Sequence, residues 1–497
     1  MREINFGRIS VMLIMMGWAT TQPMLLQAQS TQYPVQADNS AYIGPGTSQN
    51  LGGSVALVDA SQYFAQEGND ICATINYIVS YANGSGGVYG EDNSNGVVVD
   101  ARGINVSPGQ TLACAHNPFS GVYDVSQGFS ITVLLPASTI AIQQTWILPE
   151  SARIIGQGEG VTVIQACNGC FTGGGWIGPE LIDMGTNNTN FCGQLNNGYD
   201  CSAVGIEHLT IDANNQTSNS QAVDGIVNPY SQELSYVKDV AIINVPSGGT
   251  GLWLAQHDIG NSGPYSDIYF SGSGTCAQIF SSASGPSDSR PLPDTRGIHG
   301  LTCAGNSVQG TAIMVDGSYN SLEDIYITGY TEGILVGSRW SAQGNLIFNV
   351  TGGSGMNDVI HIASTQTLYS NCPPGIDNQV GNPTGNNVYA PTVCDLTIAA
   401  VTSSGTYSIQ DDLTGIKLTD SNVGIYALGE LTTIPSGSGV PSYSRFTTSP
   451  SVPAWFVGAA PSSGSACSTG SLYSATSGSA PTVWGCVASK WKAITTY

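Results

Sequence analysis

Short apolar runs recur through the middle of the chain, and apolar and polar positions alternate within each run. One set of runs reads HLTI at His208, DVAI at Asp239, DIYF at Asp267, GLTC at Gly300, DIYI at Asp324, NLIF at Asn345 and DLTI at Asp395. A second set follows the first and includes GLWL at Gly251, AIMV at Ala312, GILV at Gly333, VIHI at Val359 and GIKL at Gly415. Because successive side chains of a β-strand point to opposite faces, this pattern predicts at least two short strands in every repeat.

A repeat of about 20 to 35 residues with two or three strands is typical of a β-solenoid, in which successive coils stack. The sequence therefore predicts an all-β fold, a right-handed parallel β-helix. Two internal ladders are expected, one formed by Leu209, Val240, Ile268, Leu301, Ile325 and Leu346 and the other by Ile211, Ile242, Phe270, Cys303, Ile327 and Phe348. The alternative all-β fold, a sandwich, usually has strands every 8 to 12 residues or so, joined by hairpin turns.

Both ends of the repeat region have a different pattern. Asp70 precedes ICATINYIVSYA, in which Ile71, Ile75 and Ile78 share one helical face. We expect Asp70 to cap an N-terminal helix that covers the open first coil. Residues 466–497 contain two or three short strand-like runs and are expected to form a small C-terminal β module.

Composition suggests the boundaries of these parts. Residues 1–28 have the pattern of a signal peptide, with a short apolar segment that is far from the roughly 20 apolar residues of a membrane span. The remaining parts are an N-terminal arm or linker (29–58), the β-helix with its cap (59–434), a Pro/Gly/Ser-rich linker (435–465) and the disulfide-stapled β module (466–497). The sequence therefore predicts a secreted protein, extracellular or periplasmic, without stable membrane insertion.

The cysteines also favour export. All 12 follow residue 28, and an even number of cysteines in an exported chain suggests disulfides. The expected pairs are Cys72–Cys114, Cys167–Cys170, Cys192–Cys201, Cys276–Cys303, Cys372–Cys394 and Cys467–Cys486, although spacing alone leaves the connectivity open. Cys167 and Cys170 could begin a zinc site, but no second ligand pair follows at the required spacing, and no metal site is expected.

The charge excludes one class of partner. The chain has 12 Lys and Arg against 34 Asp and Glu, a net charge of −22, and no basic run that could follow a phosphate backbone. We therefore expect no nucleic-acid partner. An anionic polymer would be repelled unless a cation bridged it to the protein.

Three segments resemble the pectate-lyase-like superfamily. They are DICATINYIVSYANGSGG from Asp70, VVVDARG from Val97 and ARIIGQGEGVTVIQA from Ala152, and with the repeats the resemblance covers about residues 60–430. It implies a right-handed parallel β-helix and a carbohydrate-related activity, since the superfamily includes polygalacturonases, rhamnogalacturonases, pectate lyases, exo-glucanases, epimerases and phage tailspikes. The sequence departs from the familiar pattern by inserting EDNSNG before Val97. It also lacks the ordered acidic motifs of the polygalacturonases.

Candidate catalytic residues directly follow the second set of runs. His257 and Asp258 follow GLWLAQ, and Asp316 follows AIMV. If the repeats are in register, these side chains meet at one edge of consecutive coils. Because coils are about 4.8 Å apart, Asp258 and Asp316 could supply the two carboxyl groups that glycoside hydrolysis usually needs.

Substrate-binding residues are expected around the same edge. The candidates are Arg339, Trp340, Trp253, Tyr269 and Tyr326. Arg339 could bind a sugar carboxylate, and the aromatic rings could stack on sugars or line a saccharide groove.

Two other acidic sets compete with this site. Asp239, Asp267, Asp324 and Asp395 recur before the first set of strands, and such recurrence indicates a turn position that favours Asp rather than catalysis. Glu180, Asp183 and Asp212 lie on early coils, where no spacing distinguishes them.

The preferred hypothesis is a secreted carbohydrate-active enzyme that hydrolyses glycosidic bonds of a polysaccharide without a cofactor. One alternative is a polysaccharide lyase, which usually needs a basic residue and Ca²⁺; His361 and Lys417, at outward positions of the second set, keep it open. The other is a non-catalytic, glycan-binding or surface-structural β-helix protein. A homotrimer is also left open.

Overall fold

The computed structural model describes most of residues 56–428 and four strands between 455 and 494. Within 56–428, the parts not described are 81–95, 105–109, 123–129, 176–177, 187–191, 196–197, 219, 255–261, 281–294, 318–319, 339–341, 344, 364–366, 369–391, 395, 413–415 and 420. The predicted signal peptide lies outside the described residues. No helix in the described part is long and apolar enough to cross a membrane.

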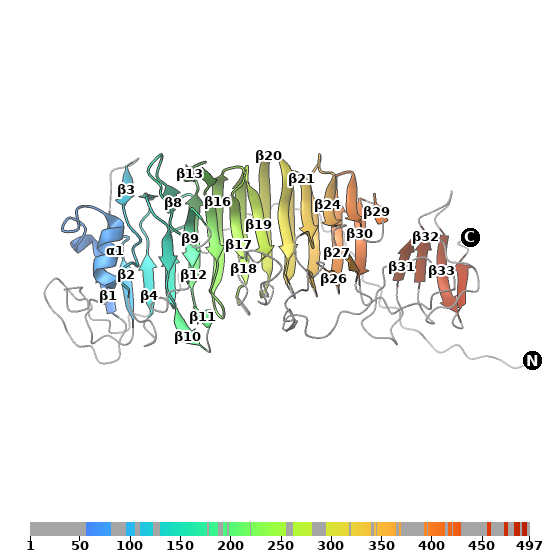
Figure 1. The fold of residues 1–497 in the computed structure, drawn as a ribbon, viewed down its shortest axis with the longest axis horizontal. Helices are drawn as coiled ribbons and strands as arrows, with labels where there is room; N and C mark the ends of the chain where they lie inside the picture. The colour runs from blue at the N-terminus through green and yellow to red at the C-terminus, as the bar shows by residue number, and fades with distance from the viewer. Residues whose placement is uncertain are drawn as a thin grey trace, which may run out of the picture. The chain divides into compact units, whose positions relative to one another are not determined.

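Most strands belong to one 23-stranded sheet, in which strands of one coil pair in parallel with those of the next (Figure 1). The first ladder contains β1 (Ala56–Asp59), β2 (Val97–Asp100), β4 (Ile131–Leu134) and β7 (Ala152–Ile155), and continues in the first parts of β12 (Gly205–Asp212), β16 (Tyr236–Val245), β18 (Tyr265–Gly272), β20 (Ile298–Asp316), β21 (Ser321–Val336), β23 (Leu346–Gly352) and β27 (Leu396–Ser403). The second ladder contains β3 (Thr111–Cys114), β5 (Thr139–Ile142) and β8 (Val163–Ala166), and continues in the later parts of the same long strands.

The third ladder completes each coil. It contains β6 (Trp146–Leu148), β9 (Glu180–Met184), β15 (Asp224–Asn228), β17 (Thr250–Leu254), β19 (Thr275–Phe280), the ends of β20 and β21, β24 (Asp358–Ile362) and β28 (Tyr407–Asp411). Two antiparallel strands end the stack, β30 (Asn422–Leu428) on β27 and β29 (Ile416–Leu418) on β28. The predicted all-β parallel β-helix is confirmed.

One backbone position makes the bend between the first and second ladders. His208, Asp239, Asp267, Gly300, Asp324, Asn349 and Ala400 align through the strand register, and all have positive φ between 52° and 68°. Gly, Asn and Asp tolerate this left-handed conformation better than other residues. The recurring Asp residues are therefore explained by the backbone, as the sequence pattern indicated; Asp395 lies outside the described residues.

The core consists of inward side chains from all three ladders, and most of the predicted members are buried. Ile325, Ile327, Ile334 and Val336, for example, are at most 1% exposed. The prediction was wrong in β23, where Leu346 and Phe348 are 37% and 44% exposed and Ile347 and Val350 are fully buried. The run NLIF lies before the left-handed Asn349, whereas DIYI starts at the left-handed Asp324. The register therefore aligns Ile347 with Leu322 and Val350 with Ile325, and these are the inward residues.

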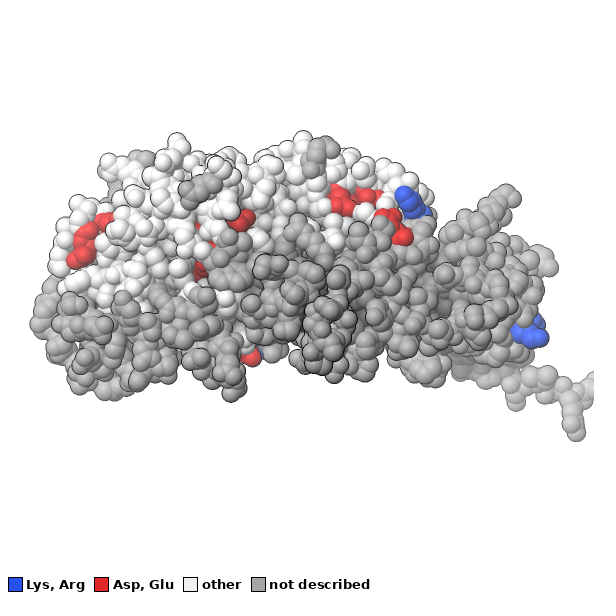
Figure 2. All heavy atoms as spheres, in the orientation of Figure 1, with Lys and Arg blue, Asp and Glu red and all other residues white. Residues whose placement is uncertain are grey.

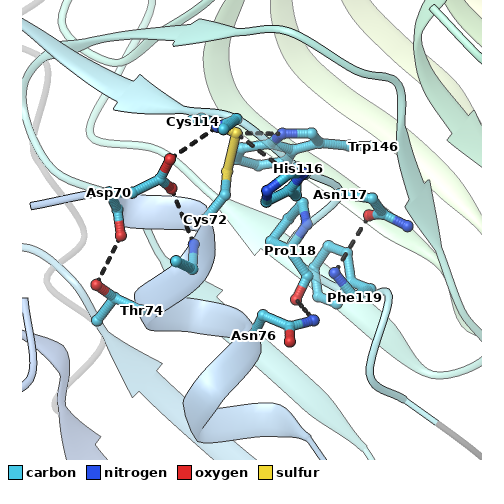
Figure 3. Close-up of a disulfide and its surroundings, with 12 residues drawn as sticks. Asp70, Cys72, Thr74, Asn76, Cys114, His116, Asn117, Pro118, Phe119 and Trp146 are labelled. Carbon is cyan, nitrogen blue, oxygen red and sulfur yellow. Dashed lines mark hydrogen bonds between the residues drawn. A yellow bond between two sulfur atoms is a disulfide. The ribbon is translucent and has the colours of Figure 1, made fainter. Parts of the chain in front are cut away.

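The predicted capping helix is α1 (Ile71–Val79), which follows the short 3₁₀ helix η1 (Ala60–Gln62). Asp70 caps α1, because one carboxylate oxygen accepts from Ala73 N at 2.9 Å, while the other accepts from Ala115 N at 2.8 Å (Figure 3). A disulfide from Cys72 to Cys114 joins α1 to β3, and Trp146 Nε1 lies 3.2 Å from the Cys114 sulfur. The helix is thus fixed to the first coils by a cap and a covalent bond.

Four of the six expected disulfides are present, namely Cys72–Cys114, Cys167–Cys170, Cys192–Cys201 and Cys276–Cys303. The two remaining pairs involve Cys372 and Cys467, which lie outside the described residues.

Buried asparagines stack at a turn of the later coils, where Asn320 precedes β21 and Asn345 precedes β23. Asn345 Oδ1 accepts from Asn320 N at 2.9 Å, and Asn345 Nδ2 donates to Gly317 O at 2.8 Å. Asn320 Oδ1 in turn accepts from Thr295 N at 3.0 Å. Both asparagines are 1% exposed, so these bonds satisfy backbone groups that water cannot reach.

Smaller sheets form outside the main one. They comprise β10 (Gly193–Leu195) with β11 (Gly198–Asp200), β13 (Thr217–Ser218) with β14 (Gln221–Ala222), β22 (Ala342–Gln343) with β26 (Thr392–Cys394) and β25 (Thr367–Leu368), and a C-terminal sheet of β31 (Trp455–Gly458), β32 (Leu472–Ala475), β33 (Thr482–Val487) and β34 (Lys490–Ile494). The strand β31 falls in the segment expected to be a linker, and β1 begins within the segment expected to be an N-terminal arm.

Candidate functional site

The structure describes half of the residues expected in the active site. His257, Asp258, Arg339 and Trp340 lie outside the described residues. Asp316 ends β20 and has no exposed surface, and its carboxylate accepts a 3.1 Å hydrogen bond from the Ser338 hydroxyl. Its catalytic role, like that of His257 and Asp258, stays a prediction.

The aromatic candidates lie on two different ladders. Tyr269 and Tyr326 are 41% and 46% exposed in the second ladder, where Thr302 lies between them in register. Trp253 is half-buried in the third ladder. The tyrosines therefore belong to a separate column from Trp253, and the structure does not bring all three rings together on one ladder.

Trp253 belongs to an outward-facing column of the third ladder. Its register partners, coil by coil, are Gln278, Met314, Leu335, His361 and Gln410. The alternation is clear on β24, where Ile360 and Ile362 are fully buried on either side of His361. We call this row of side chains, from Trp253 to Gln410, the outer column.

Titratable side chains gather at one end of the outer column. The His361 cluster consists of Glu332 on β21, Asp358 and His361 on β24, Gln410 on β28, Asp412 directly after β28, and Lys417 on β29. Figure 2 shows acidic side chains beside a basic one on the face that it presents, over this end of the β-helix. Register explains the gathering, because Glu332 pairs with Asp358, and His361 with Gln410 and then Lys417.

His361 lies between two carboxylates. Its Nδ1 contacts Glu332 Oε1, and its Nε2 is 2.9 Å from Asp412 Oδ2. Gln410 Nε2 donates to the other oxygen of Asp412 at 2.9 Å, and the Thr311 hydroxyl donates to Glu332 Oε2. The imidazole is therefore held in one orientation by partners on both ring nitrogens.

The cluster shifts the protonation of its members. The hydrogen bond with Glu332, and secondarily that with Asp412, raises the pKa of His361 to about 9 against the opposing effect of burial. Burial opposes ionisation of Glu332 and Asp412, but their hydrogen bonds with His361 lower the pKa of each carboxyl overall. Without another ligand, the group therefore resembles an imidazolium between two carboxylates.

Asp358 is the exception in the cluster. It is 7% exposed, its Oδ1 is buried, and that oxygen has no hydrogen-bond partner among the described residues. Burial, followed by the nearby charge of Glu332, raises its pKa. One ligand atom each from Glu332, Asp358 and His361 lie within 4.8 Å of one another, so these three residues could hold a metal ion.

Lys417 provides the nearby positive charge. Its Nζ lies 5.1 Å from the centre of the Tyr407 ring, in cation–π contact, and its charge lowers the pKa of Asp412. Asp412 has a side chain that is 27% exposed, against 19% for both His361 and Glu332. The solvent-facing side of the cluster is thus formed by Asp412 and Lys417.

A second pair of acids is buried in the early coils. Glu180 and Asp224 align in register on β9 and β15, and are 0% and 7% exposed. Burial raises the pKa of Asp224 to about 7, partly offset by a hydrogen bond from Thr250 N at 2.5 Å. These residues are in hydrogen-bonded, closed positions, which favours a structural role.

The sequence contained a usable signal for the His361 cluster. The chain has 5 histidines, and His361 and Lys417 occupy outward positions of recognisable strands. Glu332 and Asp358 begin their third-ladder segments, where the alternation is not yet evident, so only the register could place them beside His361.

No family model matches the chain, and no curated protein matches it. Solved structures do match. Among them are the A-module of mannuronan C-5 epimerase AlgE4 of Azotobacter vinelandii (15% identity, TM-score 0.28, covering 60% of this chain and 88% of that one) and ORF18 of Geobacillus virus E2 (13% identity, TM-score 0.33, covering 89% and 86%).

A third match is a tailspike protein of E. coli bacteriophage HK620 in complex with a hexasaccharide, with 12% identity and a TM-score of 0.30 over 69% of this chain and 59% of that one. The strand register itself defines the class: the chain is a parallel β-helix protein. The outer column ends at the His361 cluster.

Proposed function

We propose that the protein is secreted and cleaves a polysaccharide that lies along the outer column, with the reaction at the His361 cluster. The observation that carries the proposal is the alignment of Trp253 with His361 on one ladder. A ring suited to stacking on a sugar and a group of carboxylates therefore share a straight path along the coils. The four disulfides support an oxidising, extracytoplasmic compartment.

Hydrolysis is the reaction that the cluster supports best. The imidazole of His361 separates the carboxylates of Glu332 and Asp412, and one ring between two hydrogen-bonded carboxylates is compatible with the roughly 5 to 10 Å used by glycoside hydrolases. Asp412, the more exposed carboxylate, would face the substrate. A net charge of −22 also favours a neutral polymer over a uronate polymer, which elimination requires.

The test is a panel of neutral and uronate polysaccharides incubated with the mature protein. New reducing ends without an unsaturated product support hydrolysis. An unsaturated product would instead support elimination, for which Lys417 of the cluster is the candidate base. If neither product forms but a polysaccharide binds, the protein is a glycan-binding β-helix and the proposed cleavage is wrong.

A further inference from the structure

We propose that Glu332, Asp358 and His361 bind a divalent transition-metal ion of the Zn²⁺ type. Their positions in the chain, 332, 358 and 361, do not form a familiar metal-binding motif. The three residues meet because β21 and β24 are neighbours in the third ladder, which pairs Glu332 with Asp358 and brings His361 beside both.

One carboxylate oxygen of Asp358 has no hydrogen-bond partner among the described residues, which points to a missing ligand. Its Oδ1 is buried and accepts no hydrogen bond from the described residues, and the side chain is 7% exposed. Leaving a buried carboxylate without a partner is costly, whereas a bound cation would compensate the charge. A carboxylate oxygen of Asp358 lies within 4.8 Å of ligand atoms on Glu332 and His361, so one ion could contact all three after a small adjustment.

The other two ligands, His361 and Glu332, are already oriented by hydrogen bonds with Asp412 and Thr311. Asp412 accepts from His361 Nε2 at 2.9 Å, which leaves Nδ1 facing Glu332 and available as the ligand atom. Thr311 donates to Glu332 Oε2, which leaves Oε1 facing the same point. Histidines that bind metals usually donate their second ring nitrogen to a carboxylate in this way.

The ligand types indicate the kind of ion. An imidazole nitrogen with two carboxylates suits Zn²⁺ and related ions, whereas Ca²⁺ prefers six to eight oxygen ligands or so. Two carboxylates and a neutral imidazole neutralise one divalent ion. On binding, the metal–Nδ1 bond replaces the hydrogen bond between His361 and Glu332, and any proton held there is released to solvent.

The inference extends the proposed function but does not depend on it. With an ion in place, Asp412 would remain the free carboxylate of the cluster, and an ion-bound water could take the role of the second catalytic group. Binding is measured without substrate, so the two ideas can fail separately. Ion binding without cleavage would overturn the proposed function alone, and cleavage by a protein that binds no ion would overturn the metal site alone.

The test is calorimetric titration of the chelator-treated mature protein with ZnCl₂, with CaCl₂ titrated for comparison. We expect one Zn²⁺ per chain, weaker binding of Ca²⁺, and an affinity for Zn²⁺ at least tenfold lower in Asp358→Asn and His361→Gln. Asp267→Asn is the matched control, because Asp267 is exposed in the left-handed column and Asn tolerates that backbone.

Equal Zn²⁺ affinity in the wild type and both cluster variants would overturn the site, as would the absence of binding to the wild type. If a variant does not fold, thermal unfolding of the wild type decides. A ligand that binds only the folded state raises Tm, so Zn²⁺ should raise Tm more than Ca²⁺ at the same concentration. An unchanged Tm at a Zn²⁺ concentration far above that of the protein would contradict the proposal.

Discussion

Trp253 and His361 occupy one column of the third ladder, with Gln278, Met314 and Leu335 between them in register. Four strand spacings separate the two residues, a distance of about 19 Å. That is long enough for several sugar units of an extended glycan. The column therefore gives the proposed substrate a direction along the stack of coils as well as a site of reaction.

Truncation of Trp253 should weaken binding of long substrates. We expect Trp253→Ala to raise KM for a long oligosaccharide about tenfold, which corresponds to the loss of roughly 1.4 kcal/mol of stacking, with little change in kcat. The measurement is steady-state cleavage of oligosaccharides of increasing length. Tyr269→Ala, on the second ladder, is the comparison, and a larger effect there would place the glycan on the other face.

Removal of the Asp412 charge should abolish most of the turnover. We expect Asp412→Asn to lower kcat by about 10²- to 10⁴-fold, because Asn keeps the size but cannot act as acid or base. Asp267→Asn should keep wild-type turnover. Asp316→Asn tests the assignment made from sequence, since loss of activity in that variant, with full activity in Asp412→Asn, would move the reaction centre to the end of β20.

The stability of the protein should depend on pH through Asp224. Its pKa is raised from 3.8 to about 7 in the folded state, so its contribution to stability is complete below about pH 4 and is lost as pH rises through 7. The upper limit of that loss is about 4 kcal/mol. In Asp224→Asn, where Oδ1 can still accept from Thr250 N, this part of the pH dependence should disappear.

Urea unfolding of both proteins between pH 4 and pH 8 measures the difference. Parallel stability curves for wild type and Asp224→Asn would show that Asp224 ionises normally in the folded protein. Asp267→Asn should leave the wild-type curve unchanged.

The bend position suggests a stabilising substitution. Ala400 adopts φ 54° at a place where the preceding coils have Asp324 and Asn349, and the amide of Asn349 lies 2.5 Å from Asp324 Oδ1. Ala400→Asn should raise the free energy of unfolding by roughly 0.5 to 1 kcal/mol, because Asn tolerates the left-handed region at lower cost. Ala399→Asn, one residue earlier, should give no gain in the same unfolding experiment.

The asparagine stack should be sensitive to truncation. Asn345→Ala removes the buried acceptor of the hydrogen bond from Asn320 N, at a cost of about 1 to 3 kcal/mol. Asn345→Asp keeps the acceptor for Asn320 N but sets a buried carboxylate oxygen against the carbonyl oxygen of Gly317, so its unfolding midpoint should fall as well, and further at pH 7 than at pH 4. Equal midpoints for all three proteins would show that water replaces these bonds.

The repeat pattern was sufficient to predict the stacked coils, because inward residues such as Ile325 and Ile334 must alternate with outward ones on a parallel strand. The helix before the first coil was also predictable from Asp70 and the isoleucines that follow it. The pattern was misleading at Leu346 and Phe348, because NLIF resembles DIYI but lies before the left-handed residue instead of starting at it, so that Ile347 and Val350 are the inward residues.

The His361 cluster was harder to predict, because its members are brought together by register. Glu332 and His361 are separated by 29 residues in the chain and meet only because β21 and β24 pair in a particular alignment. The alternation of apolar and polar residues places His361 and Lys417 at outward positions, but their acidic partners stand at the beginnings of strands, where no alternation marks them. Candidate chemistry in such a fold is therefore better sought along columns than within motifs.

The two reversed strands at the end of the stack have a consequence for how copies of this protein meet. A coil that ends in parallel strands offers an open template on which another coil of the same direction can add. Here β30 covers β27 and β29 covers β28 in the opposite direction, so a second molecule that arrived there would find the edges of the last parallel strands already paired. At this end, the fold discourages the head-to-tail fibres that an uncapped solenoid would form.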